Sequence, residues 1–198
     1  IDGVGGIAKT RLDDAYYAPI GTWQRMGCGA THVVPVFAGD TIRDFRMASV
    51  TEALYPYGAD LTAEMPASTM VQSSLWRLKQ DLVRRKELGG FQLEIGLTWF
   101  EWNRFLRHRV GVAAISYAFV ATHNHFARMT TVGTLAGSAQ AVFVSAGVSL
   151  SGLLGLMNSS AACFWMQQTF HNKGGPGGGS SKDEKWHDFY EHDGTKLK

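Results

Sequence analysis

The chain of 198 residues is short of charge over a long internal stretch. No Asp or Glu lies between Glu101 and Asp183. Arg128 is the only Lys or Arg between residues 110 and 172. A water-exposed domain rarely leaves about 60 residues this poor in charge, because Lys, Arg, Asp and Glu are mostly surface residues. The deficit predicts that this stretch is hidden from water, and we interpret it as embedded in a membrane.

Other features are scarce as well. The only two cysteines, Cys28 and Cys163, are far apart, which argues against a disulfide framework. The net charge of +2 is mild, so the composition does not favour a nucleic-acid partner. No Ser/His/Asp or Cys/His arrangement and no metal-ligand spacing stands out. The sequence therefore predicts no enzyme, no metal site and no nucleic acid.

Small residues recur every fourth position within the charge-poor stretch. A four-residue period keeps small side chains on one helix face, where two backbones can approach closely in lipid. We predict a helix-packing interface made of Gly133, Gly137, Ala141, Ser145, Gly147, Ser151, Gly155 and Ser159, with Ser149 and Cys163 continuing the two stripes.

The fold class predicted from these patterns is mainly α. The chain is expected to be an integral membrane protein with about two transmembrane helices, residues 110–126 and 132–170. Three spans are the alternative, if a turn near residues 149–152 divides the second. The expected organisation is a small hydrophilic N-terminal region (1–98), a transmembrane helical region (99–170), a Gly/Ser linker (171–181) and an extended C-terminal tail (182–198).

The N-terminal region carries weaker signals. Ser68 is a plausible N-cap, and Val71, Leu75 and Leu82 follow at helical spacing, so a helix is predicted from residue 68 to the glycines at 89–90. Residues 32–37 and 91–97 are expected to be strands and residues 41–54 a short helix. Residues 3–10 resemble the phosphate-binding pattern GxxxxGK[ST], but Ala8 replaces the second glycine and no strand precedes it.

Two histidines lie near the end of the first expected span. His123 and His125, close to Arg128, are either interfacial residues or ligands of haem b or a quinone. Because they are two residues apart they point to different helix faces, so they cannot both bind one iron from one side. We expect no cofactor apart from bound lipid, and keep haem b as the alternative.

The C-terminal tail combines charge with aromatic residues. Trp186, Phe189 and Tyr190 are too apolar for solvent, yet the segment is too short to bury them alone. We predict that these side chains dock on a neighbouring subunit.

The combined features are typical of non-catalytic accessory subunits of large bioenergetic membrane complexes. Ile1 at the start is expected to mark a removed presequence, with a trimmed start as the alternative. We therefore predict a structural subunit of a mitochondrial respiratory-chain or ATP synthase complex. Its partners would be other subunits and the lipid bilayer. It would lie in the mitochondrial inner membrane, with both termini on the matrix side. The alternatives are a redox membrane anchor using His123 or His125 and a membrane-embedded viral structural protein.

Overall fold

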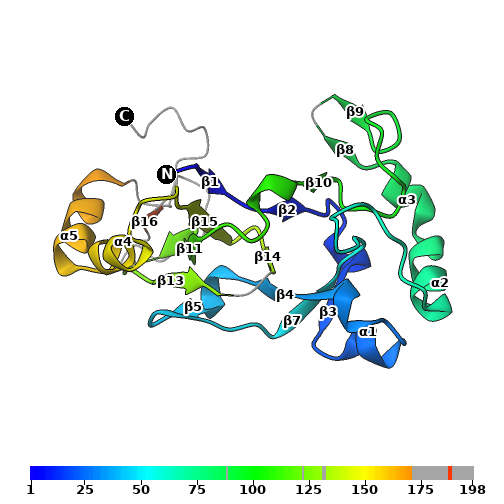
Figure 1. The fold of residues 1–198 in the computed structure, drawn as a ribbon, viewed down its shortest axis with the longest axis horizontal. Coiled ribbons are helices and arrows are strands. Elements are labelled where there is room, and N and C mark those ends of the chain that lie inside the picture. Colours follow the sequence, from blue (N-terminus) through cyan, green and yellow to red (C-terminus); the bar gives the residue numbers. More distant parts are fainter. Residues whose placement is uncertain (88, 122, 131–132, 171–186, 189–198) are drawn as a thin grey trace, which may run out of the picture.

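The chain folds as a mixed α/β protein with many short strands (Figure 1). The computed structural model describes residues 1–87, 89–121, 123–130 and 133–170, together with the backbone of residues 187–188. Two four-stranded sheets form its centre. Helices lie at both ends of the long axis, with α4 and α5 at one end and α1, α2 and α3 at the other (Figure 1).

The first sheet is antiparallel throughout. Its strand order is β1 (Gly3–Gly5), β15 (Ala139–Phe143), β11 (Ala114–Ala118) and β13 (Phe126–Met129). Ile115 pairs with Val142 on one side of β11 and with Arg128 on the other. Strand β11 is therefore central, and all five of its residues are buried.

The second sheet contains the one parallel strand pair of the described residues. Its order is β14 (Thr134–Leu135), β4 (Val33–Phe37), β7 (Thr51–Leu54) and β3 (Tyr17–Pro19). The pair β14–β4 is parallel, and the other two pairs are antiparallel.

Short ribbons and helices complete the fold. The two-stranded ribbons are β2 (Ala8–Lys9) with β10 (Arg104–Phe105), β5 (Ile42–Arg43) with β6 (Arg46–Met47), β8 (Lys86–Glu87) with β9 (Gly90–Phe91), and β12 (Val120–Ala121) with β16 (His187–Asp188). The α-helices are α1 (Thr22–Arg25), α2 (Thr69–Arg77), α3 (Lys79–Val83), α4 (Leu150–Met157) and α5 (Ser160–Thr169).

The predicted transmembrane fold is wrong. The longest described helix, α5, has 10 residues. At 1.5 Å per residue it spans about 15 Å, half of the roughly 30 Å hydrocarbon core of a bilayer. Over the part of the chain that the structure describes, no helix has both the length and the hydropathy that a membrane span requires.

The low charge of residues 110–144 comes from a sheet that is covered on both faces. Ala114, Ala141 and Phe143 belong to the core on one face, whereas Ile115 and Val142 belong to the core on the other. Strands buried on both faces lose the polar half of the usual alternation and appear as continuous apolar runs. Such a run in sequence has the same composition as a buried helix.

Local predictions in the N-terminal region had mixed outcomes. Strand β4 and the start of α2 are confirmed, and the Ser68 hydroxyl accepts a hydrogen bond from the Val71 amide. The predicted helix is divided at Leu78 into α2 and α3. Residues 41–54 contain strands β5, β6 and β7 instead of a helix, and only Phe91 of residues 91–97 lies in a strand.

One close backbone approach joins the two sheets and gives a stability prediction. A Cβ on Gly39 would lie 2.2 Å from the Ser138 carbonyl oxygen, whereas one on Gly137 would meet nothing within 4 Å. We expect Gly39→Ala to lower the free energy of unfolding by about 2–3 kcal/mol, because backbone must move. Gly137→Ala should be neutral or stabilising by up to about 1 kcal/mol. Urea denaturation of both variants tests this, and equal stabilities would contradict the observed approach.

Candidate functional site

A cleft lined by basic residues lies between the two sheets. Its volume is about 470 Å³. Residues of β1, β2, β10 and the β14–β15 turn form its walls. The cationic side chains that line it are Lys9, Arg11, Arg104 and Arg109. Asp13 is the single acidic residue of the lining, so positive charge dominates the cleft.

The ribbon β2–β10 places two cations side by side. Arg104 pairs directly with Lys9 in the antiparallel register, and both residues are exposed. Side chains directly opposite each other in such a pair lie on the same face, where like charges repel. This arrangement costs stability, which makes it a candidate for binding an anion.

Glu87 offsets part of that repulsion. Its carboxylate lies 2.8 Å from an Arg11 guanidinium nitrogen and 3.9 Å from one of Arg104. Burial alone would raise the pKa of Glu87, but the Arg11 hydrogen bond and the charges of Arg11, Arg104 and Lys9 lower it overall. One carboxylate among three cations leaves an excess of positive charge on the ribbon.

Arg109 is one of the cations that line the cleft. It donates a hydrogen bond of 2.8 Å to the Gly6 carbonyl, and its guanidinium lies 4.7 Å from the centre of the Phe143 ring. The cation thus ties the segment between β1 and β2 to the core under the first sheet.

A buried arginine connects the two strands of the ribbon from behind. Arg85 is 5% exposed. Its guanidinium donates to four carbonyl oxygens, those of Leu82 (2.9 Å), Thr10 (2.6 Å), Trp99 (3.2 Å) and Glu101 (2.8 Å). Thr10 directly follows Lys9, and residues 99–101 lead into β10. Arg85 therefore fixes the position of both basic strands relative to α3.

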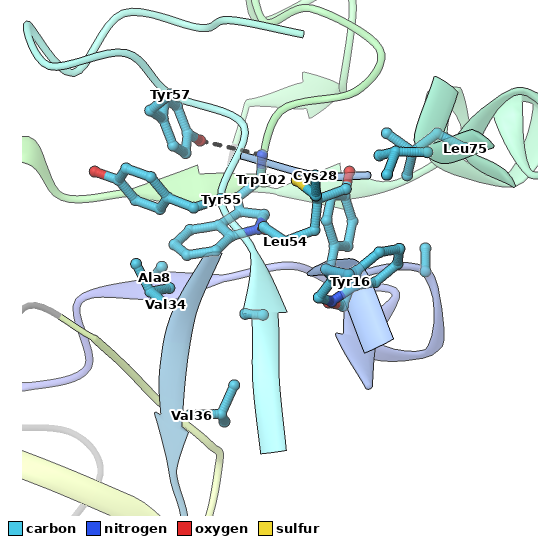
Figure 2. Close-up of a cluster of buried hydrophobic side chains, with 14 of the residues drawn as sticks. Ala8, Tyr16, Cys28, Val34, Val36, Leu54, Tyr55, Tyr57, Leu75 and Trp102 are labelled. Carbon is cyan, nitrogen blue, oxygen red and sulfur yellow. Dashed lines mark hydrogen bonds between the residues drawn. The ribbon is translucent and has the colours of Figure 1, made fainter. Parts of the chain in front are cut away.

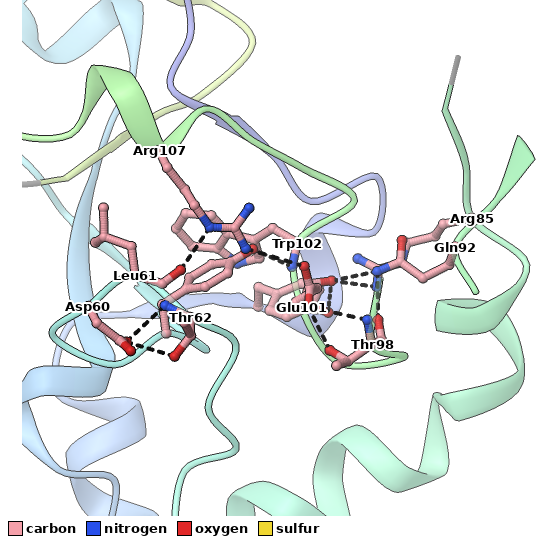
Figure 3. Close-up of polar contacts among 11 residues, drawn as sticks. Asp60, Leu61, Thr62, Arg85, Gln92, Thr98, Glu101, Trp102 and Arg107 are labelled. Atoms are coloured by element: carbon pink, nitrogen blue, oxygen red, sulfur yellow. Dashed lines mark hydrogen bonds and ion pairs between the residues drawn. The ribbon is translucent and has the colours of Figure 1, made fainter. Parts of the chain in front are cut away.

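Further polar contacts hold the loop that leads into β10 (Figure 3). The Gln92 amide donates to the carbonyls of Thr98 (2.9 Å) and Glu101 (3.0 Å). The Glu101 carboxylate accepts hydrogen bonds from the Thr98 amide and hydroxyl and lies 3.8 Å from Arg107. Arg107 also donates to the Leu61 carbonyl at 2.9 Å. The loop is therefore held by Gln92 and by its own Thr98–Glu101 contacts, and Arg107 connects it to Leu61.

An aromatic core supports the ribbon from below (Figure 2). Trp102 is 1% exposed and packs against Tyr55, Tyr57 and Phe105. Its amide donates to the Tyr57 hydroxyl, and its indole nitrogen donates to the Leu54 carbonyl. Burial raises the pKa of Tyr57 above its ordinary value.

The Gly-rich segment 3–10 does not form a phosphate-binding loop before a helix. It forms β1 and β2, which follow each other along the cleft wall. Lys9 nevertheless lies among the cations of the cleft. It does so through its pairing with Arg104, which the motif does not predict.

The residues predicted for the helix-packing interface do not share one helix. Gly133 precedes β14, Gly137 lies in the β14–β15 turn and Ala141 lies in β15. Ser145 and Gly147 follow β15. Ser151 and Gly155 lie on α4, and Ser159 is the N-cap of α5. The continuous helix through all eight positions is therefore absent from these described residues.

His123 and His125 lie in the segment before β13, and Arg128 lies in β13. Burial and then the nearby charge of Arg43 lower the pKa of His125. No group of three or more His, Cys, Asp or Glu residues that could hold a metal ion occurs within the described residues. The expectation of no cofactor stays a prediction. Trp186, Phe189 and Tyr190 lie outside the described residues.

Sequence reasoning missed the ribbon as a unit. No sequence pattern paired Arg104 or Arg109 with Lys9. One usable signal was the charge of residues 77–109, which contain eight Lys or Arg and four Asp or Glu.

Comparison with known proteins places these features in a longer context. No protein-family model matches the chain. The chain is 34% identical over 205 residues to the adenine-specific methyltransferase PglX of Streptomyces coelicolor, a match that covers 98% of the chain and 17% of that protein. Its fold is similar to part of the Type IIL restriction-modification enzyme MmeI, solved in complex with DNA. That match has a TM-score of 0.61 and 11% identity, and it covers 84% of the chain and 22% of MmeI. The chain thus spans roughly a fifth of the length of each protein.

These findings overturn the function predicted from sequence. A mitochondrial accessory subunit is wrong, because the matching proteins are a bacterial methyltransferase and a restriction-modification enzyme. The prediction of no enzyme is wrong for the same reason. The exclusion of nucleic acid is contradicted, because the matching proteins are a methyltransferase and a restriction-modification enzyme that was solved in complex with DNA. The inner-membrane location, the membrane-complex partners and the redox-anchor and viral alternatives all assumed the incorrect transmembrane fold.

The contacts of Arg85 generate a second stability prediction. Arg85→Met keeps the aliphatic part of the side chain but removes the guanidinium that donates to four carbonyls, of which only that of Glu101 keeps a second side-chain amide donor, from Gln92. We expect the free energy of unfolding to fall by about 3 kcal/mol or more. Arg84→Met, a change at the exposed neighbouring arginine, should stay within about 0.5 kcal/mol of the parent chain. Chemical denaturation followed by circular dichroism measures both. Similar losses in the two variants would show that the Arg85 contacts are not structurally important.

Proposed function

We propose that the chain contributes the DNA-contacting surface of an adenine-specific DNA methyltransferase. The observation that carries this proposal is the like-charged pair Lys9–Arg104, held on a ribbon at the mouth of a basic cleft. Similarity to a methyltransferase, and to a restriction-modification enzyme solved with DNA, supports the same assignment.

The electrostatics of the ribbon suit a polyanion better than a small neutral ligand. Exposed Lys and Arg side chains bind phosphates, and the release of counterions from DNA adds to affinity. Arg guanidinium groups can also bind phosphate oxygens in a bidentate manner. A phosphate at the cleft mouth would relieve the repulsion between Lys9 and Arg104 that Glu87 offsets only in part.

The contacts behind the ribbon hold its cations at fixed positions, which suits binding to the regularly spaced phosphates of DNA. Arg85, Gln92 and Glu101 hold the strands through buried hydrogen bonds, so the cations require little ordering when DNA binds. Phosphate contacts of this kind fix the register of a protein on the duplex, on which any base reading depends.

The proposed role predicts that removing a cation weakens DNA binding and that removing Glu87 strengthens it. Lys9→Gln and Arg104→Gln should each weaken binding to a short duplex and make the slope of log affinity against log salt shallower by about 0.9. Glu87→Gln should strengthen binding, because it removes the negative charge among the three cations. Fluorescence anisotropy over a series of salt concentrations measures both effects.

Arg25→Gln is the matched control for these variants. Arg25 is exposed on α1, near the opposite end of the molecule from α4 and α5, and does not line the cleft. It should change the slope less than Lys9→Gln does. Binding that is unaffected by Lys9→Gln and Arg104→Gln, or weakened by Glu87→Gln, would overturn the proposal.

A further inference from the structure

The helix pair α4–α5 presents an outer face whose composition is unusual for a solvated surface. Leu156, Phe164 and Trp165 are 63%, 67% and 57% exposed. Neither helix contains a charged residue. A helix that borders water normally carries charged or polar side chains on its outer side. An uncharged outer face with large exposed apolar side chains is typical of a surface that another protein covers.

The inner face of the pair is already occupied. Met166 is buried, and Leu153, Leu154 and Met157 pack against the core on the same face of the first sheet. The Asn158 side chain exchanges two hydrogen bonds of 3.0 Å with the backbone of Phe126 at the start of β13. The helix pair is therefore anchored to the sheet, and this anchoring determines which side points outward.

Gly155 adds an independent observation. It lies in the middle of α4, where glycine costs about 1 kcal/mol relative to alanine. A Cβ at this position would meet nothing within 4 Å, so no neighbour within the described chain requires its small size. Glycine in an exposed helix is explained if a surface outside the chain approaches the backbone closely.

The charge of the face also limits what can cover it. DNA requires cations, and α4 and α5 have none. The cations of the proposed DNA surface lie on β2 and β10, away from the end of the molecule that α4 and α5 form (Figure 1). Both surfaces can therefore be occupied at the same time.

We propose that the outer face of α4–α5 docks on the remainder of the methyltransferase polypeptide, through an uncharged apolar surface of that remainder. This proposal rests on the proposed function for the identity of the partner. The matched segment is 17% of PglX and 22% of the MmeI chain, so most of each protein lies outside it and is available as a partner within the same polypeptide. Permanent interfaces of this kind are depleted of charge at their centre.

Hydroxyl-radical footprinting provides the test, with two tryptophans of similar exposure as a matched pair. Trp165 is 57% exposed and Trp76, on α2, is 60% exposed. The chain alone is compared with a hybrid in which it replaces the matched segment of the Streptomyces protein. Oxidation of Trp165 should slow by at least about fivefold in the hybrid, because an interface centre excludes water. Oxidation of Trp76 should slow less.

Three results would overturn the docking proposal or separate it from the proposed function. Equal oxidation of Trp165 in the chain and in a folded hybrid would show that this face is not covered. Protection of Trp165 in the chain alone, together with a dimer in sedimentation, would assign the face to a second copy and overturn the proposal. Protection of Trp165 in a hybrid that does not bind DNA would support docking and count against the DNA-contacting role.

A misfolded hybrid, detected by circular dichroism, calls for a second comparison. The Streptomyces protein itself is then footprinted, both intact and as its matched 205-residue segment. Protection of the helix pair that aligns with α4–α5 in the intact protein supports the proposal, and equal labelling in both forms overturns it.

Discussion

The buried guanidinium of Arg85 is the interaction on which the geometry of the proposed DNA surface depends. It donates to carbonyls from α3, from the residue after β2 and from the loop before β10. Because the carbonyls are buried, their loss of a donor cannot be repaired by water at low cost. The buried cation Arg85 therefore determines where the exposed cations Lys9 and Arg104 lie.

The exposed cations carry a stability cost that has a functional explanation. Lys9 and Arg104 are directly opposed, and Glu87 compensates them only in part. Folding alone would favour an oppositely charged pair at this position. A ligand of opposite charge would relieve this repulsion, and in the proposed function that ligand is a DNA phosphate. The apolar face of α4–α5 is also unfavourable for the chain alone. In the proposed docking, a partner surface covers its exposed Phe164 and Trp165.

Sequence patterns predicted the parts of the fold that local physics determines. The Ser68 cap and the spacing of Val71 and Leu75 predicted α2, since a helix depends on contacts three and four residues apart. The same reasoning failed for residues 110–144. A run of apolar residues suits a membrane helix and a doubly covered strand equally, and a four-residue repeat is a multiple of the two-residue strand period. The paired cations could not be predicted from sequence patterns, because Lys9 and Arg104 become neighbours only through the β2–β10 register.

Chemical labelling of lysines with and without DNA measures whether the β2–β10 ribbon contacts the duplex. Lys9 is exposed on the ribbon, whereas Lys79 lies on α3 above the Trp76 ring. The amine of Lys9 should react with an acetylating reagent in the free chain and be protected when a duplex saturates it, while the reactivity of Lys79 changes little. Equal reaction rates of Lys9 in the free and DNA-bound states would contradict a DNA contact at the ribbon.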